Sequence, residues 1–293
     1  MRPDLEKRIA RLAVDRESGA SEIVEEAIAI LAEALHLEED LPAVARAVCA
    51  AQPTMGPVWN AAINALAARE RPERFTVFTQ RLARAPDALA RFSREIFGPG
   101  QEPLRIATIS YSRTVLHVFA ALAERRLLRV ACTESRPALE GRKLALKLAA
   151  LRVPVTFFTD AAIGHALGAV DAVLVGADAI GPEFFLNKSG TRMLAAAALH
   201  QGVPVYVLAS RDKFVTREVA GRLQPREGPA ADLWDTPPEG VTIRNPYFEA
   251  TPLDLISAVI TDIGVLGAGA VPDVCEATDP ETPSATLALL RPF

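Results

Sequence analysis

The first hundred residues carry apolar side chains at the spacing of α-helices. In residues 21–35 (SEIVEEAIAILAEAL) the apolar positions recur every three or four residues, so they fall on one helical face. Residues 56–68 and 74–97 continue this kind of pattern, and FGPGQEP at 97–103 interrupts it with glycine and proline. The pattern predicts a helical domain over residues 1–100.

From residue 104 onward the period changes. Short apolar runs alternate with helical patterns, which is typical of parallel strands that are joined by helices and buried on both faces. We predict strands at 104–110, 127–135, 153–160, 170–178 and 203–210, with helices at 112–126, 140–151, 162–168 and 188–201. The fold class that follows is α/β: an N-terminal helical domain followed by a Rossmann-like domain over residues 101–293 with a mainly parallel sheet.

Two later segments differ from this alternation. Residues 217–243 contain LQPREGPAADLWDTPPEG, which is too long and too rich in proline and glycine for an ordinary connection, and they predict a lid or a partner-contact loop. Residues 245–266 (NPYFEATPLDLISAVITDIGVL) predict an extended entry followed by a helix.

Composition excludes several classes of function. Half of the 293 residues are hydrophobic, 23% are charged and the net charge is −4, so we expect a globular protein without broad nucleic-acid binding. The three cysteines are far apart and form no CxxC pair, which argues against a disulfide framework or a metal site and favours a reducing compartment. No apolar stretch reaches the roughly 20 residues of a membrane span, and the N-terminus lacks the apolar core of a secretory signal. We therefore expect a cytoplasmic protein with no membrane partner.

Polar side chains follow each predicted strand of the sheet. They are Ser110, Glu134 with Arg136, Asp160, Asp178, and Ser210 followed by Lys213. In an open parallel sheet, ligands bind beyond the carboxyl ends of the strands, so these positions predict a ligand site. Taken singly, each residue is equally well explained by a turn that favours Asp or Ser. The set as a whole favours a site.

The segment NKSGT at 187–191 is the best candidate for binding an anion. Asn187 or Ser189 can cap the predicted helix, and Lys188 adds a positive charge beside the free amides of its first turn. An ordinary capped helix explains the same residues. The segment is neither a P-loop nor a GxGxxG fingerprint, so nucleotide hydrolysis and NAD binding are not indicated.

Residues 104–266 contain a series of blocks that resembles a known family. VLVGADAI, NKSGT and AAAALHQGVPVYVLASRDKF, with TESRPALEGRKLALKL at 133–148, resemble the shared core of the translation initiation factor 2B alpha, beta and delta subunits. The same core occurs in methylthioribose-1-phosphate isomerase and ribose-1,5-bisphosphate isomerase. The resemblance implies a helical domain before a Rossmann-like domain, a homodimer or higher homo-oligomer, and a phosphorylated sugar or nucleotide as ligand, with no cofactor.

The resemblance also assigns roles to residues. In the isomerases, a cysteine and the aspartate of the GAD block form an acid/base pair; the aspartate corresponds to Asp178, and Ser110 stands at the position of the cysteine. Residues 52–54 are Gln-Pro-Thr and resemble an Arg-Pro-Thr motif of the isomerases. Gln52 stands at the position of the arginine, so the resemblance implies that one phosphate-binding arginine is missing. The residues that we expect around the ligand are Ser18, Gly19, Ala20, Thr54, Arg113, Glu134, Arg136, Asn187, Lys188 and Lys213.

Two main functions follow from these residues. The string SYSRTV at 110–115 is closest to the factor 2B alpha-type proteins, and a serine hydroxyl is a much weaker acid than a thiol, whose pKa is about 8.5. We therefore favour a regulatory or binding protein for a phosphorylated sugar or nucleotide. The alternative is an aldose–ketose isomerase acting on a phosphorylated pentose, in which Asp178 moves a proton and Ser110 or a water replaces the thiol. A third alternative is an oligomerisation module with a vestigial site.

Overall fold

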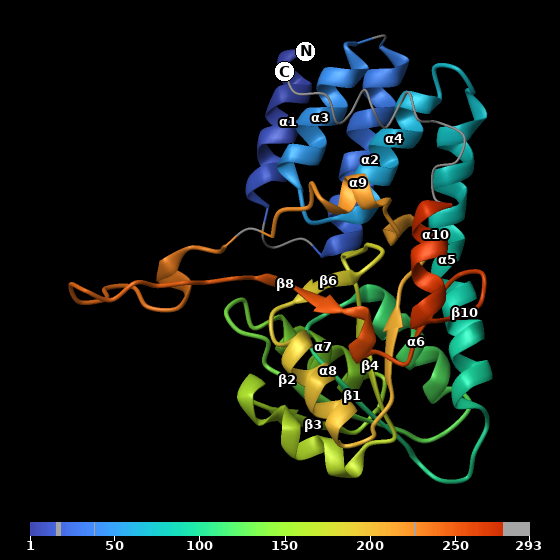
Figure 1. Cartoon of the computed structure of the whole chain (residues 1–293), viewed down its shortest axis with the longest axis vertical. Helices are drawn as coiled ribbons and strands as arrows, with labels where there is room; N and C mark the ends of the chain where they lie inside the picture. The colour runs from blue at the N-terminus through green and yellow to red at the C-terminus, as the bar shows by residue number, and fades with distance from the viewer. Residues whose placement is uncertain (16–18, 38, 226, 278–293) are drawn as a thin grey trace.

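The computed structural model describes residues 1–15, 19–37, 39–225 and 227–277. Helices from the N-terminal part of the chain lie at one end of a mainly parallel sheet, and further helices cover both faces of that sheet (Figure 1). The predicted fold class, α/β with N-terminal helices ahead of a Rossmann-like sheet, is confirmed. The division into domains at residue 100 stays a prediction.

The N-terminal helices are amphipathic and share one core. They are α1 (Pro3–Val14), α2 (Ala20–His36), α3 (Leu41–Ala51), α4 (Gly56–Ala67) and α5 (Glu73–Phe97). Leu31 and Leu41 are fully buried among them. The same core also takes in side chains from much later in the chain, namely Ala179, Leu186, Val215, Val219 and Leu223. The helices therefore pack onto the second half of the chain and share their core with it.

The longest helix, α5, links the two regions. Phe75 and Phe78 belong to the core of the N-terminal helices, whereas Leu89 and Ala90 pack in a core of the main sheet. The helix extends from the helical end of the molecule down beside the sheet (Figure 1). Neither α5, at 25 residues, nor any other helix in the described part of the chain is long and apolar enough to cross a membrane.

The main sheet has seven strands in the order β10-β9-β7-β4-β1-β2-β3. Their bounds are β1 (Leu104–Thr108), β2 (Leu128–Thr133), β3 (Val155–Phe158), β4 (Ala172–Gly176), β7 (Val205–Leu208), β9 (Ala258–Ile260) and β10 (Val265–Gly267). Every pair of neighbours is parallel except β9 and β10. All residues of β4 are buried, as expected for a strand that is covered on both faces.

Helices on the two faces of the sheet build two separate cores. The covering elements are α6 (Arg113–Ala123), α7 (Glu140–Ala150), the 3₁₀ helix Asp160–Ala169, α8 (Thr191–His200) and α10 (Val271–Glu276). Val173 and Val207 point toward α8, α10 and the 3₁₀ helix, whereas Leu174 and Leu208 point toward α6 and α7. Because successive strand residues face opposite cores, both must be apolar, which explains the continuous apolar runs in the sequence.

A second, antiparallel sheet follows β4 in the chain. It consists of β5 (Ala179–Ile180), β6 (Phe184–Lys188) and β8 (Phe248–Pro252), in that order. Asn187 and Lys188 end β6, and α8 begins only at Thr191, so the prediction that these two residues start a helix is wrong. Asn187 pairs with Glu249 of β8. Pairing with a strand so far away in the sequence produces no local pattern that would predict β6. The helix that follows does produce one, so the prediction extended that helix too far toward the N-terminus.

The helix predicted within residues 245–266 is also wrong. β8, the 3₁₀ turn Leu253–Leu255, β9 and β10 occupy this segment. Pro252 is incompatible with a helix interior, and Val259 and Ile260 pair with β7 as a further parallel strand. Pairing with an existing sheet outweighs the weak local helical pattern.

Residues 227–247 form an arm that extends away from the body of the molecule (Figure 1). It follows α9 (Arg217–Ala220), and its base is closed where the amide of Gly228 donates to the carbonyl of Asn245 at 2.7 Å. Trp234, on the arm, is 49% exposed. A role for this arm as a lid or as a partner contact stays a prediction.

Candidate functional site

The order of the main sheet creates a crevice between β1 and β4. The chain proceeds from β1 to β2 and β3 on one side, and continues to β4, β7 and β9 on the other. At such a switch point the connecting helices lie on opposite faces, which leaves a crevice beyond the carboxyl ends of the strands. A cavity of about 250 Å³ occupies this position and is lined by the residues that follow both strands.

Most of the residues expected around a ligand line this cavity. They are Gly19, Ala20, Thr54, Ser110, Arg113, Asp178, Asn187, Lys188 and Lys213. Glu134 and Arg136 do not line it, and Ser18 lies outside the described residues. The structure thus brings the start of α2, the turn before α4 and the strand ends together around one space.

Asp178 lies two residues beyond the end of β4 and is fixed by its backbone. Its amide donates to the carbonyl of Leu186 at 2.7 Å, and its carbonyl accepts from the amide of Gly56, at the start of α4, at 2.9 Å. Its carboxyl group accepts no hydrogen bond from the described residues. Burial raises the pKa of this carboxyl to about 6, against the opposing effect of Lys213 and Lys188. Asp178 can therefore exchange a proton near neutral pH.

Ser110 follows β1 in a left-handed backbone conformation, with φ of 70°. Its amide donates to Oγ of Ser135 at 2.8 Å, and its hydroxyl donates to Oε1 of Glu140 at 2.9 Å. A positive φ is unfavourable for a residue with a side chain, and it persists only where surrounding contacts impose it. The contacts from Ser135 and Glu140 hold the hydroxyl of Ser110 at the cavity wall.

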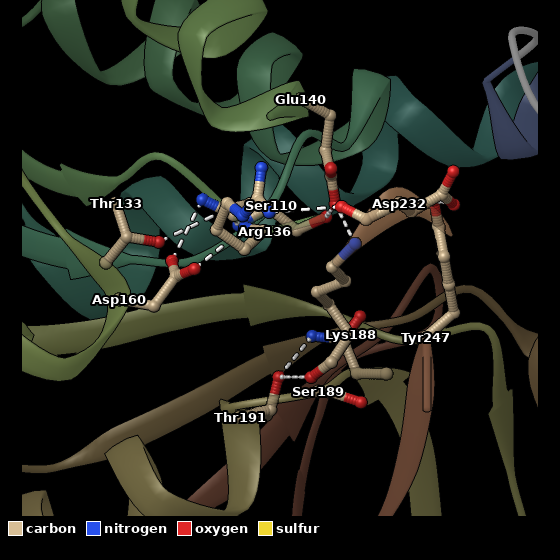
Figure 2. Close-up of polar contacts among 12 residues, drawn as sticks. Ser110, Thr133, Arg136, Glu140, Asp160, Lys188, Ser189, Thr191, Asp232 and Tyr247 are labelled. Atoms are coloured by element: carbon tan, nitrogen blue, oxygen red, sulfur yellow. Dashed lines mark hydrogen bonds and ion pairs between the residues drawn. The ribbon is translucent and has the colours of Figure 1, made fainter. Parts of the chain in front are cut away.

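Lys188 points from the end of β6 into the cavity and is only 3% exposed. Its Nζ lies 2.8 Å from Oε1 of Glu140 and 4.5 Å from the ring centroid of Tyr247. Figure 2 shows Ser110 and Lys188 converging on the same carboxylate of Glu140. A buried ammonium group needs such a partner, because an unpaired charge in the interior is strongly destabilising.

Lys213 lies in a 3₁₀ turn after β7, and α4 holds that turn in place. The side chain of Asn60 in α4 donates to the carbonyls of Asp212 and Phe214, at 2.7 Å each. Lys213 itself donates through Nζ to the carbonyl of Ala177, next to Asp178. An N-terminal helix thus positions a basic side chain of the site.

Glu249 occupies two of the backbone amides at the start of α8, which corrects the prediction that residues 187–191 hold an anion there. Oε1 of Glu249 accepts from the amides of Gly190 and Arg192, at 2.7 and 2.9 Å. Asn187 donates to Oγ1 of Thr191 at 2.9 Å and so supports the first turn through a side chain. The carboxylate of Glu249 already occupies the position where an anion would bind.

Removing this cap is expected to lower stability. Glu249→Ala leaves the amides of Gly190 and Arg192 without their acceptor, so we expect a loss of about 1 kcal/mol in the free energy of unfolding. Glu249→Gln keeps an oxygen at the same place and loses only the charge, so its effect should be smaller. Urea unfolding of the two variants measures the difference. Equal stability of Glu249→Ala and the wild type would show that Glu249 does not stabilise the start of α8.

Arg136 does not line the cavity and instead contacts the arm. Its amide donates to Asp160 at 2.7 Å, and its Nη2 donates to the carbonyl of Asp232 at 3.0 Å. Oδ2 of Asp232 in turn accepts from the hydroxyl of Tyr247 at 3.1 Å. Glu134, the other residue expected on this wall, lies 3.9 Å from Arg142. The hydrogen bonds of Arg136 and Tyr247 to Asp232 hold the arm in place, with Tyr247 beside Lys188.

Arg113 lines the cavity, but its guanidinium group is paired with carboxylates of α2. Nη2 lies 2.7 Å from Glu25, and Nη1 lies 3.9 Å from Glu22. Glu22 also accepts from the amide of Gly19 at 2.7 Å. These contacts join the starts of α2 and α6 at the entrance of the cavity.

Sequence reasoning missed Glu140, Lys143 and Tyr247, which line the cavity, and Asn60, which supports the turn of Lys213 from α4. Glu140 carried a signal, because it is the first residue of the helix after β2, and helices that follow parallel strands begin at the same edge as the site. No local sequence pattern identifies Asn60 or Tyr247, because their roles depend on contacts with segments far away in the chain.

The cysteines, all within the described ranges, cannot replace the missing thiol. Cys49, Cys132 and Cys275 are buried and do not line the cavity. Burial raises the pKa of the Cys132 thiol to about 12, which makes it inert at neutral pH. Within the same ranges, His, Cys, Asp and Glu side chains form no group of three or more with the geometry of a metal site.

Solved structures share this fold. The translation initiation factor eIF-2B of Pyrococcus horikoshii OT3 superposes with a TM-score of 0.77 over 91% of this chain and 98% of that chain, at 24% identity. The 5-methylthioribose 1-phosphate isomerase of the same organism superposes with a TM-score of 0.68 over 94% of this chain and 87% of that chain, at 20% identity. At such identities the likeness shows the fold alone.

Sequence relatives carry the names of sugar-phosphate isomerases. The methylthioribose-1-phosphate isomerase of Dehalococcoides mccartyi is 33% identical over 61% of this chain and 58% of that protein. The 5-deoxyribose 1-phosphate isomerase of Moorella thermoacetica is 37% identical over 55% of this chain and 49% of that protein. The chain matches between about half and three fifths of the length of these curated relatives. The sequence model of the Initiation factor 2 subunit family matches residues 16–268, so the chain belongs to that family.

Proposed function

We propose that this chain is an aldose–ketose isomerase acting on a pentose 1-phosphate. The observation that carries the proposal is the carboxyl group of Asp178, which lines the cavity without a hydrogen bond from any described residue and has a pKa raised to about 6. General acid–base catalysis works best with a group whose pKa lies near the working pH. The names of the sequence relatives support the same class of reaction.

The sequence alone favoured a regulatory or binding role, and the comparisons support the isomerase alternative better. Position 110 favours binding, because a serine stands there in place of a cysteine. The serine affects one of two proton-transferring groups, and it leaves Asp178 intact. The relatives with the matching core are named as isomerases of a methylthioribose 1-phosphate and of a 5-deoxyribose 1-phosphate.

Basic side chains give the cavity places for one phosphate group. Lys143 and Lys213 line it, and Nζ of Lys143 lies 4.8 Å from the ring centroid of Tyr111. Lys188 is already paired with Glu140. We assign the phosphate to Lys143 and Lys213, because lysine ammonium groups bind phosphate as point charges. The sugar hydroxyls then face Asp178 and Asn187.

A second candidate, binding without turnover, is favoured by one observation. The hydroxyl of Ser110 donates to Glu140 and is a far weaker acid than the thiol that it replaces. A site with one competent acid/base group could hold a sugar phosphate and leave it unchanged. The two candidates differ in turnover and agree on the ligand.

The test uses three compounds: ribose 1,5-bisphosphate, 5-methylthioribose 1-phosphate and 5-deoxyribose 1-phosphate. We expect at least one to raise the melting temperature of the protein and to be converted to the ketose, followed by proton NMR. Lys213→Met is expected to raise KM about tenfold or more through loss of a phosphate contact, which corresponds to about 1.4 kcal/mol. Lys147→Met, an exposed lysine of α7, is the matched control and should leave KM unchanged.

Other outcomes separate the alternatives. Stabilisation by a compound that is never converted would support binding and contradict the isomerase. Neither stabilisation nor turnover with any of the three would favour an oligomerisation module with a vestigial site.

Assembly and location are part of the same proposal. A solved neighbour from C. thermophilum is described as a tetrameric eIF2B complex, and it superposes with a TM-score of 0.71 at 18% identity. We expect this chain to form a homodimer or a higher homo-oligomer in the cytoplasm. Light scattering of the purified protein gives the oligomeric mass directly.

A further inference from the structure

The proposed isomerisation needs two proton-transferring groups. The ring oxygen must gain a proton as its bond to C1 breaks, and the hydroxyl at C2 must lose one as C2 becomes a carbonyl carbon. Asp178 supplies one of the two groups. We infer that Glu140 supplies the other, acting through the hydroxyl of Ser110, and this inference rests on the proposed function.

The contact between the two side chains has the geometry of a proton relay. Oγ of Ser110 lies 2.9 Å from Oε1 of Glu140, and the hydroxyl is the donor because an ionised carboxylate only accepts. Both residues line the cavity, so the free lone pairs of the serine oxygen can face a ligand. Figure 2 shows the contact between this hydroxyl and the carboxylate of Glu140.

The backbone of Ser110 supports the same assignment. The residue is held in a left-handed conformation, with φ of 70°, by the hydrogen bond from its amide to Ser135. Ser135 is itself in the left-handed region, with φ of 60°, and its amide donates to Asp160. Strain of this kind concentrates at functional sites, where it fixes a side chain in one place. Here it fixes the serine oxygen between Glu140 and the cavity.

The second oxygen of Glu140 is one of a few buried side-chain polar atoms without a hydrogen-bond partner among the described residues. Oε2 is buried and has no hydrogen-bond partner within the described part of the chain, while Oε1 accepts from both Ser110 and Lys188. Buried polar atoms are almost always hydrogen-bonded, and an unpartnered one calls for an explanation, of which a chemical role is one.

The relay completes the reaction with a balanced transfer of atoms. Asp178 in its acid form gives its proton to the ring oxygen as the C1–O bond breaks. The hydrogen on C2 moves to C1 with its electron pair. The C2 hydroxyl then passes its proton to the oxygen of Ser110, while the hydroxyl proton of Ser110 passes to Glu140. Glu140 ends protonated and Asp178 ionised, and exchange with water restores both.

The decisive experiment compares Glu140→Gln in two backgrounds. With Ser110 present, the amide cannot accept a proton, so kcat is expected to fall roughly 100-fold with KM little changed. Ser110→Ala should cause the same loss, and the double variant should lose no more, because the two residues act as a unit. In a Ser110→Cys background, Glu140→Gln should have little effect, since a thiol with a pKa of about 8.5 exchanges protons without help.

Controls keep the experiment interpretable. Glu124→Gln, at the far end of α6 and paired with Arg94 at 3.2 Å, should leave all rates unchanged. If Glu140→Gln does not fold because Lys188 loses its partner, Glu140→Asp keeps the charge, withdraws the carboxylate from Ser110 and should show the same loss of kcat. An equal loss in the wild-type and Ser110→Cys backgrounds would assign Glu140 a structural role and overturn the relay. Turnover by the wild type with an unaffected Glu140→Gln overturns the relay alone, whereas no turnover by the wild type overturns the proposed function as well.

Discussion

Asp178→Asn is expected to lower the turnover of a pentose 1-phosphate by roughly 10²–10⁴-fold, the usual contribution of a positioned acid or base. Asparagine has the same shape and leaves the backbone contacts of residue 178 with Gly56 and Leu186 in place. It cannot exchange a proton, so the loss should appear in kcat. Initial rates followed by proton NMR measure it. Asp254→Asn, which changes an exposed carboxylate in the turn after β8, is the matched control.

The same substitution is expected to stabilise the ligand-free protein at alkaline pH. Burial raises the pKa of Asp178 from an ordinary 3.8 to about 6, so the folded protein binds its proton more tightly than the unfolded chain does. The stability that this group contributes is therefore present below pH 4 and is lost as pH rises through 6. At pH 8, where the carboxyl group is ionised, this shift lowers the free energy of unfolding by about 3 kcal/mol compared with a low pH at which the group is neutral.

Thermal unfolding at several pH values measures this effect. We expect Asp178→Asn to melt at a higher temperature than the wild type at pH 8, with the difference shrinking between pH 6 and pH 4. A variant that is less stable than the wild type at pH 8 would show that the lysines stabilise the ionised carboxylate more than burial disfavours it. Together with the rate, this result would separate a chemical role of Asp178 from a purely structural one.

Gly141→Ala is expected to give the largest loss of stability among single substitutions near the site. A Cβ at this position would lie 1.8 Å from the carbonyl oxygen of Thr133 and 2.9 Å from its carbonyl carbon. Backbone atoms of β2 cannot move aside without breaking the strand, so α7 would have to shift. We expect a loss of about 3 kcal/mol or more in the free energy of unfolding, measured by urea denaturation.

Gly164→Ala provides the control for this prediction. Gly164 lies in the 3₁₀ helix between β3 and β4, and a Cβ there would meet nothing within 4 Å. Its substitution should change stability by less than about 1 kcal/mol. If Gly141→Ala were as stable as Gly164→Ala, the close approach of α7 to the end of β2 would be wrong, and with it the position of Glu140.

The parallel sheet could be predicted because each strand has a local signature. Strands buried on both faces give apolar runs, and the polar residues that follow them, such as Ser110 and Asp178, mark their carboxyl ends. These signatures identified most of the cavity. The segment NKSGT singled out Lys188, which lines the cavity, but assigned it to the wrong kind of element, because β6 is a strand only through its pairing with β8.

The remaining errors share a physical origin. Glu249 as the cap of α8, Asn60 as the support of Lys213 and Tyr247 as the cover of Lys188 are all contacts between distant segments. Periodicity and capping rules describe only neighbours in the chain. Arg136 is an example of the opposite error. Its sequence position predicts contact with a ligand, whereas in the structure it contacts the arm.

The shared core of the N-terminal helices has a consequence for synthesis on the ribosome. Helices α1 to α4 emerge first, but their core also contains Val215, Val219 and Leu223, which are translated much later. Until those residues leave the exit tunnel, part of the apolar surface of the helices has no native partner and is exposed to other chains and to chaperones. The helices should therefore reach their native packing only after α9 has been synthesised, and truncation before residue 223 should yield aggregated helices rather than a stable helical fragment.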